Sequence, residues 1–255
     1  MDNSVKKQLD ALLSKLTISD EKTYVCEKCK DTGYSVVDGK AFPCTCDSYK
    51  REVRLPKKLD GVSLDDFKIK YYPNKVIDAT VSGETYEDKA AKVLVACESF
   101  VVEIMEGKKN LKGLFITGPV GSGKTFISAC IYNELKNQGR DVVFYVVPEL
   151  LGKSKEAMFD DSRKDNFMDG VKNASVLILD DLGAHNYTAW TTNQLYLLLN
   201  YRLNHMLPTV ITTNLDFNDI EMYLDERIAS RILELCKVYN LKTDKDIRYK
   251  KLKEK

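Results

Sequence analysis

The chain has 255 residues, of which 44% are hydrophobic and 30% are charged, and its formal net charge is only +1. This length suits one domain of about 200 residues with a smaller one, and the hydrophobic content is enough for a packed core. The balanced charge excludes nucleic-acid binding through an overall basic character, so any such binding would need a local patch.

The chain lacks the marks of a membrane or secreted protein. No apolar run approaches the length that spans a bilayer, and the first residues lead into an amphipathic segment and not a secretory signal. We therefore expect a cytoplasmic protein with no membrane partner. In such a protein, seven cysteines favour metal binding or buried thiols over disulfides.

An amphipathic helix is predicted near the N-terminus. Its apolar residues share one helical face: Val5, Leu9, Leu12, Leu13 and Leu16. A helix this short must dock on something, either its own chain or a partner.

Four cysteines follow in two close pairs, Cys26-x-x-Cys29 and Cys44-x-Cys46. Four thiolates satisfy tetrahedral Zn²⁺ with no open position, so the predicted site is structural. The alternatives are a redox pair, which is expected at the start of a helix in a βαβ unit, or reduced buried cysteines. The other cysteines lie in apolar contexts and are predicted to be core residues: Cys97, Cys130 and Cys236.

Three kinds of segment follow the cysteine pairs. Residues 50–58 are basic and are predicted to be helical, whereas residues 64–74 are aromatic and irregular. Residues 86–105 show apolar residues at helical spacing and predict a long helix.

The strongest motif is the phosphate-binding pattern G-x-x-x-x-G-K-[ST]. It comprises Gly118, Pro119, Val120, Gly121, Ser122, Gly123, Lys124 and Thr125. Residues 114–117 predict a buried strand before the loop, and residues 126–136 predict a helix after it, which is the context such a loop needs. Glycines let backbone amides surround a phosphate, Lys124 reaches the β- and γ-phosphates, and the Thr125 hydroxyl ligates Mg²⁺.

Strands and helices then alternate, which predicts an α/β fold with a parallel sheet covered by helices on both faces. Predicted strands are residues 142–147, 176–180, 210–213 and 236–241. Predicted helical segments are a helix starting at Pro148, residues 153–172, 190–206 and short helices over 216–234.

Two carboxylates end the strand at 176–180. Asp180 is predicted to hold Mg²⁺ directly or through water, and Asp181 to orient or deprotonate the attacking water. Asn214 follows the strand at 210–213, where it could sense the γ-phosphate or merely cap the next helix.

Arg227 and Arg231 lie four residues apart on one face of a predicted helix. They either belong to a solvated face or reach the nucleotide bound by a neighbouring subunit.

These motifs resemble the DnaC/DnaI/IstB group of AAA+ ATPases, above all the replicative helicase loaders. The resemblance rests on the phosphate loop, Asp180-Asp181-Leu182-Gly183, Thr212-Thr213-Asn214 and Ser230-Arg231-Ile232, in that order, and covers roughly residues 60–250. It implies an AAA+ ATPase domain at 61–255, preceded at 1–60 by the helix and zinc module as a helicase-interaction candidate.

The resemblance also implies roles at matching positions. Asn214 would be the first γ-phosphate sensor, Arg231 the arginine finger with Arg227 as second choice, and Arg248 the second sensor. The implied contacts with single-stranded DNA include Thr188, Trp190, Lys153 and Lys155. Many AAA+ proteins have Glu where this chain has Asp181.

The expected function is ATP-dependent loading of a hexameric DnaB-type helicase onto single-stranded DNA, with ATP, Mg²⁺ and Zn²⁺ as cofactors and self-association in a ring or spiral. One alternative is an IstB-type transposition ATPase that acts with a transposase on double-stranded DNA. Another is a nucleotide-gated adaptor that binds ATP and barely hydrolyses it.

Overall fold

The computed structural model describes residues 34–37, 40–43, 55–75, 83–158, 166–183 and 187–253. The chain divides into two compact units, Met1–Lys50 and Arg51–Lys255, whereas the predicted domain boundary lies at residue 60. In the first unit, β1 (Tyr34–Val37) and β2 (Lys40–Pro43) form an antiparallel pair with Tyr34 opposite Pro43.

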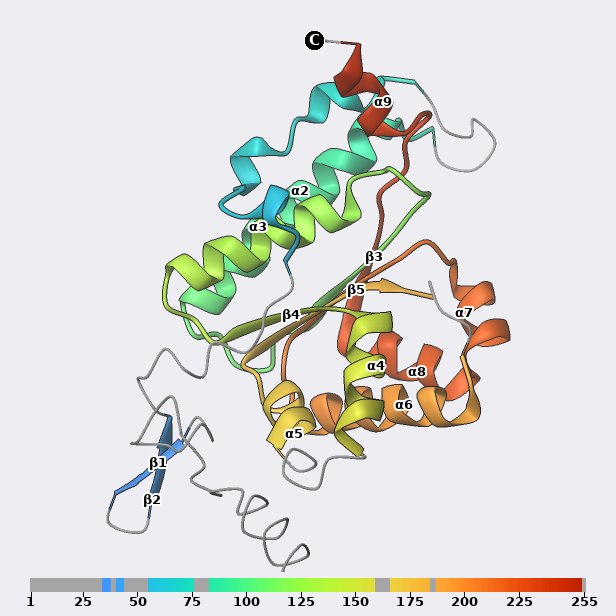
Figure 1. The fold of residues 1–255 in the computed structure, drawn as a ribbon. Helices are drawn as coiled ribbons and strands as arrows, with labels where there is room; N and C mark the ends of the chain where they lie inside the picture. The colour runs from blue at the N-terminus through green and yellow to red at the C-terminus, as the bar shows by residue number, and fades with distance from the viewer. Residues whose placement is uncertain are drawn as a thin grey trace, which may run out of the picture. The chain divides into compact units, whose positions relative to one another are not determined.

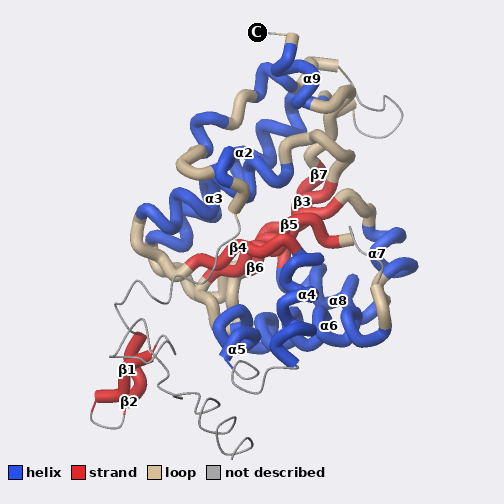
Figure 2. Tube along the Cα trace, viewed as in Figure 1, coloured by secondary structure: helices blue, strands red, loops and turns tan. Residues whose placement is uncertain are grey.

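A five-stranded parallel sheet forms the centre of the second unit (Figures 1 and 2). In spatial order its strands are β4 (Val142–Val146), β5 (Val176–Leu182), β6 (Thr209–Thr213), β3 (Gly113–Thr117) and β7 (Cys236–Asn240). Each neighbouring pair is parallel, which confirms the α/β class and the predicted strands.

Helices cover both faces of this sheet, as Figure 2 shows. One face carries α2 (Tyr86–Met105) and α3 (Lys124–Asn137). The other carries α4 (Val147–Met158), α5 (Asn166–Lys172), α6 (Ala189–Asn204) and α8 (Glu226–Leu235). Two short helices, α7 (Phe217–Tyr223) and α9 (Ile247–Leu252), follow β6 and β7.

Successive side chains along each strand point to opposite faces of the sheet and pack into two separate hydrophobic cores. Leu114 and Ile116 of β3 pack into the core under α2 and α3, while Phe115 between them packs into the core under α4, α6 and α8. Ile178 and Leu177 of β5 divide in the same way. Because both faces are buried, these strands have continuous apolar sequences.

The helix predicted at 86–105 is confirmed at both ends. It begins after Thr85, whose hydroxyl accepts a hydrogen bond from the Asp88 amide at 3.0 Å and so satisfies one free N–H of the first turn. The buried thiol of Cys97 lies on its inner face. Cys130 and Cys236 are buried as well, so these three cysteines are core residues as predicted.

The prediction of a helix over 50–58 is wrong where the structure describes the segment. From Leu55 onward the chain forms only the 3₁₀ turn η2 (Lys57–Leu59), because Pro56 precedes it and its contacts are tertiary. The Asn133 side chain donates to the Leu59 and Val62 carbonyls at 2.9 Å each. These bonds attach the residues directly after Lys58 to α3.

Residues 64–74 are irregular and aromatic, as predicted. They contain the 3₁₀ turns η3 (Leu64–Asp66) and η4 (Ile69–Tyr71). The Leu64 amide donates to Glu134 of α3 at 2.8 Å, and the Lys250 amine of α9 donates to the Tyr71 carbonyl at 2.5 Å. The segment is therefore attached both to α3 and to the last helix.

Candidate functional site

The phosphate loop lies between β3 and α3, at the carboxyl end of the sheet. Its backbone turns through left-handed conformations, with φ of +98° at Gly123. A Cβ at this position would lie 2.9 Å from the Tyr72 hydroxyl oxygen, so glycine is required here both by the backbone and by the neighbouring side chain. The loop thus has the conformation that lets amides point toward a bound phosphate.

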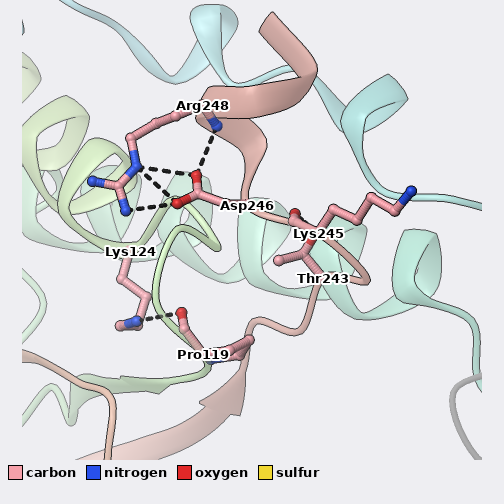
Figure 3. Close-up of polar contacts among 6 residues, drawn as sticks. All are labelled: Pro119, Lys124, Thr243, Lys245, Asp246 and Arg248. Atoms are coloured by element: carbon pink, nitrogen blue, oxygen red, sulfur yellow. Dashed lines mark hydrogen bonds and ion pairs between the residues drawn. The ribbon is translucent and has the colours of Figure 1, made fainter.

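Lys124 points back into the loop. Its Nζ donates to the Gly118 carbonyl at 2.7 Å and to the Pro119 carbonyl at 2.9 Å, the second of which Figure 3 shows. The side chain is only 6% exposed. Burial lowers the pKa of Lys124 from 10.5 to about 8, against the opposing effects of Asp181 and Asp180. Within the described ranges its hydrogen bonds go only to these carbonyls, so a phosphate could become its hydrogen-bonded anionic partner.

Asp180 is a buried carboxylate at the end of β5, and a hydroxyl of β6 holds it. The Thr212 hydroxyl donates to Asp180 Oδ1 at 2.6 Å, and Ser128 lies 3.4 Å from the same oxygen. Burial raises the pKa of Asp180, whereas hydrogen bonds from Thr212 and Thr125 lower it. The Thr125 hydroxyl and the Asp180 carboxylate, placed together as predicted, are hard oxygen donors of the kind that Mg²⁺ prefers.

Asp181 has a strained backbone, with φ of +62°. The β5–β6 pairing shifts register between Leu179 and Leu182, so Asp181 lies in an irregularity of the sheet. The Thr212 hydroxyl accepts the Asp181 N–H at 3.0 Å and therefore contacts both acidic residues. The sequence motif includes Thr212 but predicts no role for it, because a β-branched residue in a strand gives no sign of a contact with two carboxylates.

Asn214 turns toward Asp181. Its Nδ2 lies 3.4 Å from Asp181 Oδ1, while the cap of α7 is Asp216, whose side chain accepts from the Asp219 amide. The alternative that Asn214 caps this helix is therefore wrong. Its position beside Asp181 is the one that a phosphate sensor needs.

A cavity of about 670 Å³ opens at these residues. Lys124, Thr125, Asp181 and Asn214 line one part of it, while residues 56–72 and α9 line the rest. In that second part Phe67 and Tyr72 stack with ring centroids 5.5 Å apart, and the Tyr72 hydroxyl donates to the Ser122 carbonyl at 2.5 Å. The cavity thus joins a polar, charged end to an aromatic wall.

Arg248 reaches this cavity from α9. Its Nε and Nη2 lie 3.0 and 2.8 Å from the carboxylate of Asp246, as Figure 3 shows. Sequence reasoning found Arg248 only through the family resemblance and missed Asp246. The available signal was the Asp-x-Arg spacing at the start of a helix.

The two arginines of α8 lie outside the residues that line the cavity. Arg227 pairs with Asp225 at 2.8 Å and stacks over the Tyr196 ring, with its side chain 63% exposed. Arg231 bonds Glu234 at 3.1 Å and is 30% exposed, with its buried Nε lacking a hydrogen-bond partner in the described part of the chain. Within one chain the structure does not bring them to the phosphate loop.

The DNA-contact candidates lie on two helices away from the cavity lining. Thr188 is the exposed N-cap of α6, and Trp190 is half-buried in the first turn of that helix. Lys153 and Lys155 lie on α4, where the Lys153 amine sits 6.0 Å from the centre of the Tyr145 ring.

Cys26, Cys29, Cys44 and Cys46 lie outside the described residues, as does the predicted helix with Val5 to Leu16. Among the residues that are described, no group of His, Cys, Asp and Glu could hold a metal ion by itself. Within those same ranges, no helix is both long and apolar enough to cross a membrane.

Comparisons with known proteins agree with this geometry. The family model described as IstB-like ATP binding protein matches residues 88–254. The curated protein named Replicative helicase loader DnaI, from Bacillus subtilis (strain 168), is 26% identical over 252 residues, covering 90% of this chain and 79% of that protein.

Two solved structures share the fold. The crystal structure of the DnaC helicase loader has a TM-score of 0.58 and 25% identity, covering 72% of this chain and 98% of that one. The crystal structure of the DnaI has a TM-score of 0.58 and 27% identity, covering 76% of this chain and 95% of that one. With the phosphate loop, the paired carboxylates and the five-stranded parallel sheet, these matches show that the chain belongs to the family of IstB-like ATP binding proteins, in the DnaC/DnaI/IstB group of AAA+ ATPases.

Proposed function

We propose that the cavity binds ATP with Mg²⁺ and that the chain hydrolyses it. The loop amides and Lys124 would hold the phosphates, and the base would lie in the part of the cavity lined by residues 56–72 and α9. Family membership supports ATP binding and ATPase activity. Lys124 is a buried cation whose hydrogen bonds, among the described residues, go to the Gly118 and Pro119 carbonyls, and a triphosphate would best complement this charge.

Thr125 and Asp180 would hold the Mg²⁺ ion. The metal would neutralise charge on the β- and γ-phosphates. The buried carboxylate of Asp180, with its raised pKa, would be stabilised in its charged form by a divalent cation beside it. Lys124→Ala should abolish ATP binding measured by calorimetry in the presence of Mg²⁺. Unchanged binding would refute the site.

Asp181 and Asn214 would place the attacking water. Their side chains meet at 3.4 Å beside the cavity, with Asp181 fixed by its bond to Thr212. Because Asp181 is shorter than the Glu found in many AAA+ proteins, the adaptor alternative predicts binding with little turnover. Comparing ATP turnover with and without single-stranded DNA decides between them: stimulated turnover supports an enzyme, and none in either case supports an adaptor.

We infer that the partner is a hexameric DnaB-type replicative helicase, which the protein loads onto single-stranded DNA. One observation carries this inference: the similarity to the helicase loader DnaI covers 90% of the chain and so extends well ahead of residue 88, where the family model begins. The protein should form a complex with its cognate helicase, detected by mass, whose amount depends on ATP. No complex with or without ATP would refute the partner.

Self-association would complete the ATPase site. Arg231, with Arg227 as second choice, lies outside this chain's cavity, so either would act on the nucleotide of a neighbouring copy in a ring or spiral. Arg231→Ala should lower turnover while ATP binding by the isolated protein is kept.

The proposed contacts with single-stranded DNA are Thr188, Trp190, Lys153 and Lys155. Their substitution should weaken DNA binding without affecting nucleotide affinity.

The first unit is proposed to be a zinc module that contacts the helicase. The β1–β2 pair lies in sequence between Cys26-x-x-Cys29 and Cys44-x-Cys46, so one short hairpin separates the two cysteine pairs. Four thiolates would hold Zn²⁺ structurally. Purified protein should contain about one zinc per chain by elemental analysis, and substituting the cysteines should remove it together with helicase binding.

The second candidate is transposition with a transposase on double-stranded DNA, as for an IstB-type ATPase. The match of the IstB-like family model favours it. Replication genes beside this gene would support the loader, and an adjacent transposase gene would support the alternative. ATP-dependent binding of double-stranded DNA in preference to single-stranded DNA would decide for transposition.

A further inference from the structure

The start of α9 lies directly against the phosphate loop. The Ile247 amide donates to the Gly121 carbonyl at 3.0 Å, and the Asp246 carboxylate lies over the Gly121 α-carbon. A Cβ built on Gly121 would lie 2.1 Å from Asp246 Cγ, and φ at this glycine is +75°. Glycine at 121 therefore admits the Asp246 carboxylate as well as shaping the loop.

Asp246 holds the guanidinium of Arg248 by two of its three nitrogens. Nε lies 3.0 Å from Oδ1 and Nη2 lies 2.8 Å from Oδ2, the fork arrangement that fixes a guanidinium plane (Figure 3). The Arg248 amide also donates to Oδ1 at 2.8 Å, so one carboxylate both caps the helix and holds the side chain. This leaves Nη1 outside the fork.

The two residues occupy different sides of the site. Arg248 lines the cavity together with Lys124 and Thr125, whereas Asp246 is not among its lining residues. The positive charge of Arg248 contributes to the lowered pKa of Lys124, so the two cations are close enough to repel each other. Asp246 thus contacts both the phosphate loop and Arg248 without lining the cavity itself.

We propose that Asp246 is a positioning residue that holds Arg248 so that its free Nη1 faces the terminal phosphate of ATP, and thereby makes the protein prefer ATP over ADP. This inference rests on nucleotide binding in the cavity, as proposed above. The Arg248 side chain is 68% exposed and would otherwise sample many rotamers. Fixing it beforehand removes the entropy that contact with phosphate would have to overcome.

A second Asp-x-Arg pair, at the start of α8, shows that the fork by itself does not make a phosphate contact. Asp225 and Arg227 pair in the same way at the start of α8, with Nε at 3.0 Å and Nη2 at 2.8 Å. The Asp-x-Arg fork is therefore a local way to begin a helix. Only the pair at α9 lies against the phosphate loop and presents its arginine to the cavity.

The test compares Asp246→Ser with Asp246→Ala in the full chain. Serine keeps the ability to cap the helix but cannot form the fork, so a purely structural role predicts that it restores wild-type behaviour. The measured quantity is the ratio of dissociation constants for ADP and a non-hydrolysable ATP analogue, by calorimetry with Mg²⁺. A ratio is used because removing one carboxylate changes the affinity for both nucleotides in the same direction.

We expect both variants to lower the preference for the ATP analogue about tenfold, the value of one well-placed charged hydrogen bond. In an Arg248→Ala background the same changes should have no further effect, because Asp246 acts through that arginine. Asp216→Ser, which removes the carboxylate cap of α7, should leave the ratio unchanged.

Three outcomes would overturn the proposal: a wild-type ratio in Asp246→Ser, equal losses for both nucleotides, or an undiminished effect in the Arg248→Ala background. If the wild-type protein binds neither nucleotide, the proposed function fails and this inference fails with it. If the wild type binds ATP and the ratio does not respond, only the role of Asp246 is wrong.

Discussion

The buried ammonium of Lys124 makes the ligand-free protein less stable than it could be, and Lys124→Met should reveal this. The pKa of Lys124 is about 8 in the folded protein, against 10.5 for an ordinary lysine. Below pH 8 the group is charged in both states, so folding bears the full cost of about 3 kcal/mol. Above pH 10.5 it is neutral in both states and the cost is gone.

Methionine at 124 does not titrate, so the change with pH in the stability difference between the two proteins comes from Lys124 alone. Wild-type stability should rise relative to the variant as the pH increases from 8 to 10.5, by about 3 kcal/mol in total. The variant loses two hydrogen bonds to the Gly118 and Pro119 carbonyls, each worth about 1 kcal/mol. At pH 7 Lys124→Met should therefore be more stable by about 1 kcal/mol, and at high pH it should be less stable.

Urea unfolding at pH 7, 8.5 and 10 measures this difference. Trp190 is the only tryptophan of the chain and lies in the second unit, so its fluorescence reports on the unit that contains Lys124. Lys237→Met, at an exposed site on β7, controls for the lost charge and the added methionine. The reasoning is refuted if the difference between wild type and Lys124→Met is the same at every pH.

Three further substitutions test contacts around the site and in the core. Thr212→Val removes the hydroxyl bonded to Asp180 and should lower the free energy of unfolding by about 2 kcal/mol and reduce turnover, with Thr212→Ser restoring both; no recovery in serine would contradict the role of the hydroxyl. Tyr72→Phe breaks the bond to the Ser122 carbonyl and should cost about 1 kcal/mol in urea unfolding, and unchanged stability would show that this bond contributes nothing. Arg202→Met removes a fully buried guanidinium that donates to three carbonyls, so calorimetric unfolding should show a loss of about 3 kcal/mol; a variant as stable as wild type would mean that burying the charge costs as much as its bonds supply.

The phosphate-loop end of the candidate site could be predicted because its chemistry is local in sequence. Glycine spacing, the following Lys124 and Thr125, and a strand that ends in two carboxylates each carry their own signal. Parallel strands end at one edge of a sheet, so the sequence predicts that Asp180 and Asn214 lie near the loop.

The aromatic end could not be predicted, because it depends on contacts between distant parts of the chain. Tyr72 lies fifty residues before Ser122, and nothing near either residue indicates their bond. The role of Asp246 likewise appears only when α9 is seen against Gly121. The helix predicted at 50–58 is wrong over its described residues, 55–58, for a related reason: Pro56 opposes a continuous helix, and bonds from Asn133 hold the residues that follow.

The strand order has a consequence for synthesis of the chain on the ribosome. β3, which leads into the phosphate loop, pairs only with β6 and β7 among the described strands, and both of these lie within residues 209–240. A nascent chain that has emerged only as far as α6 contains the complete loop but neither of the strands that flank β3. Because such long-range pairing forms slowly, the cavity beside the phosphate loop should be among the last parts of the domain to assemble.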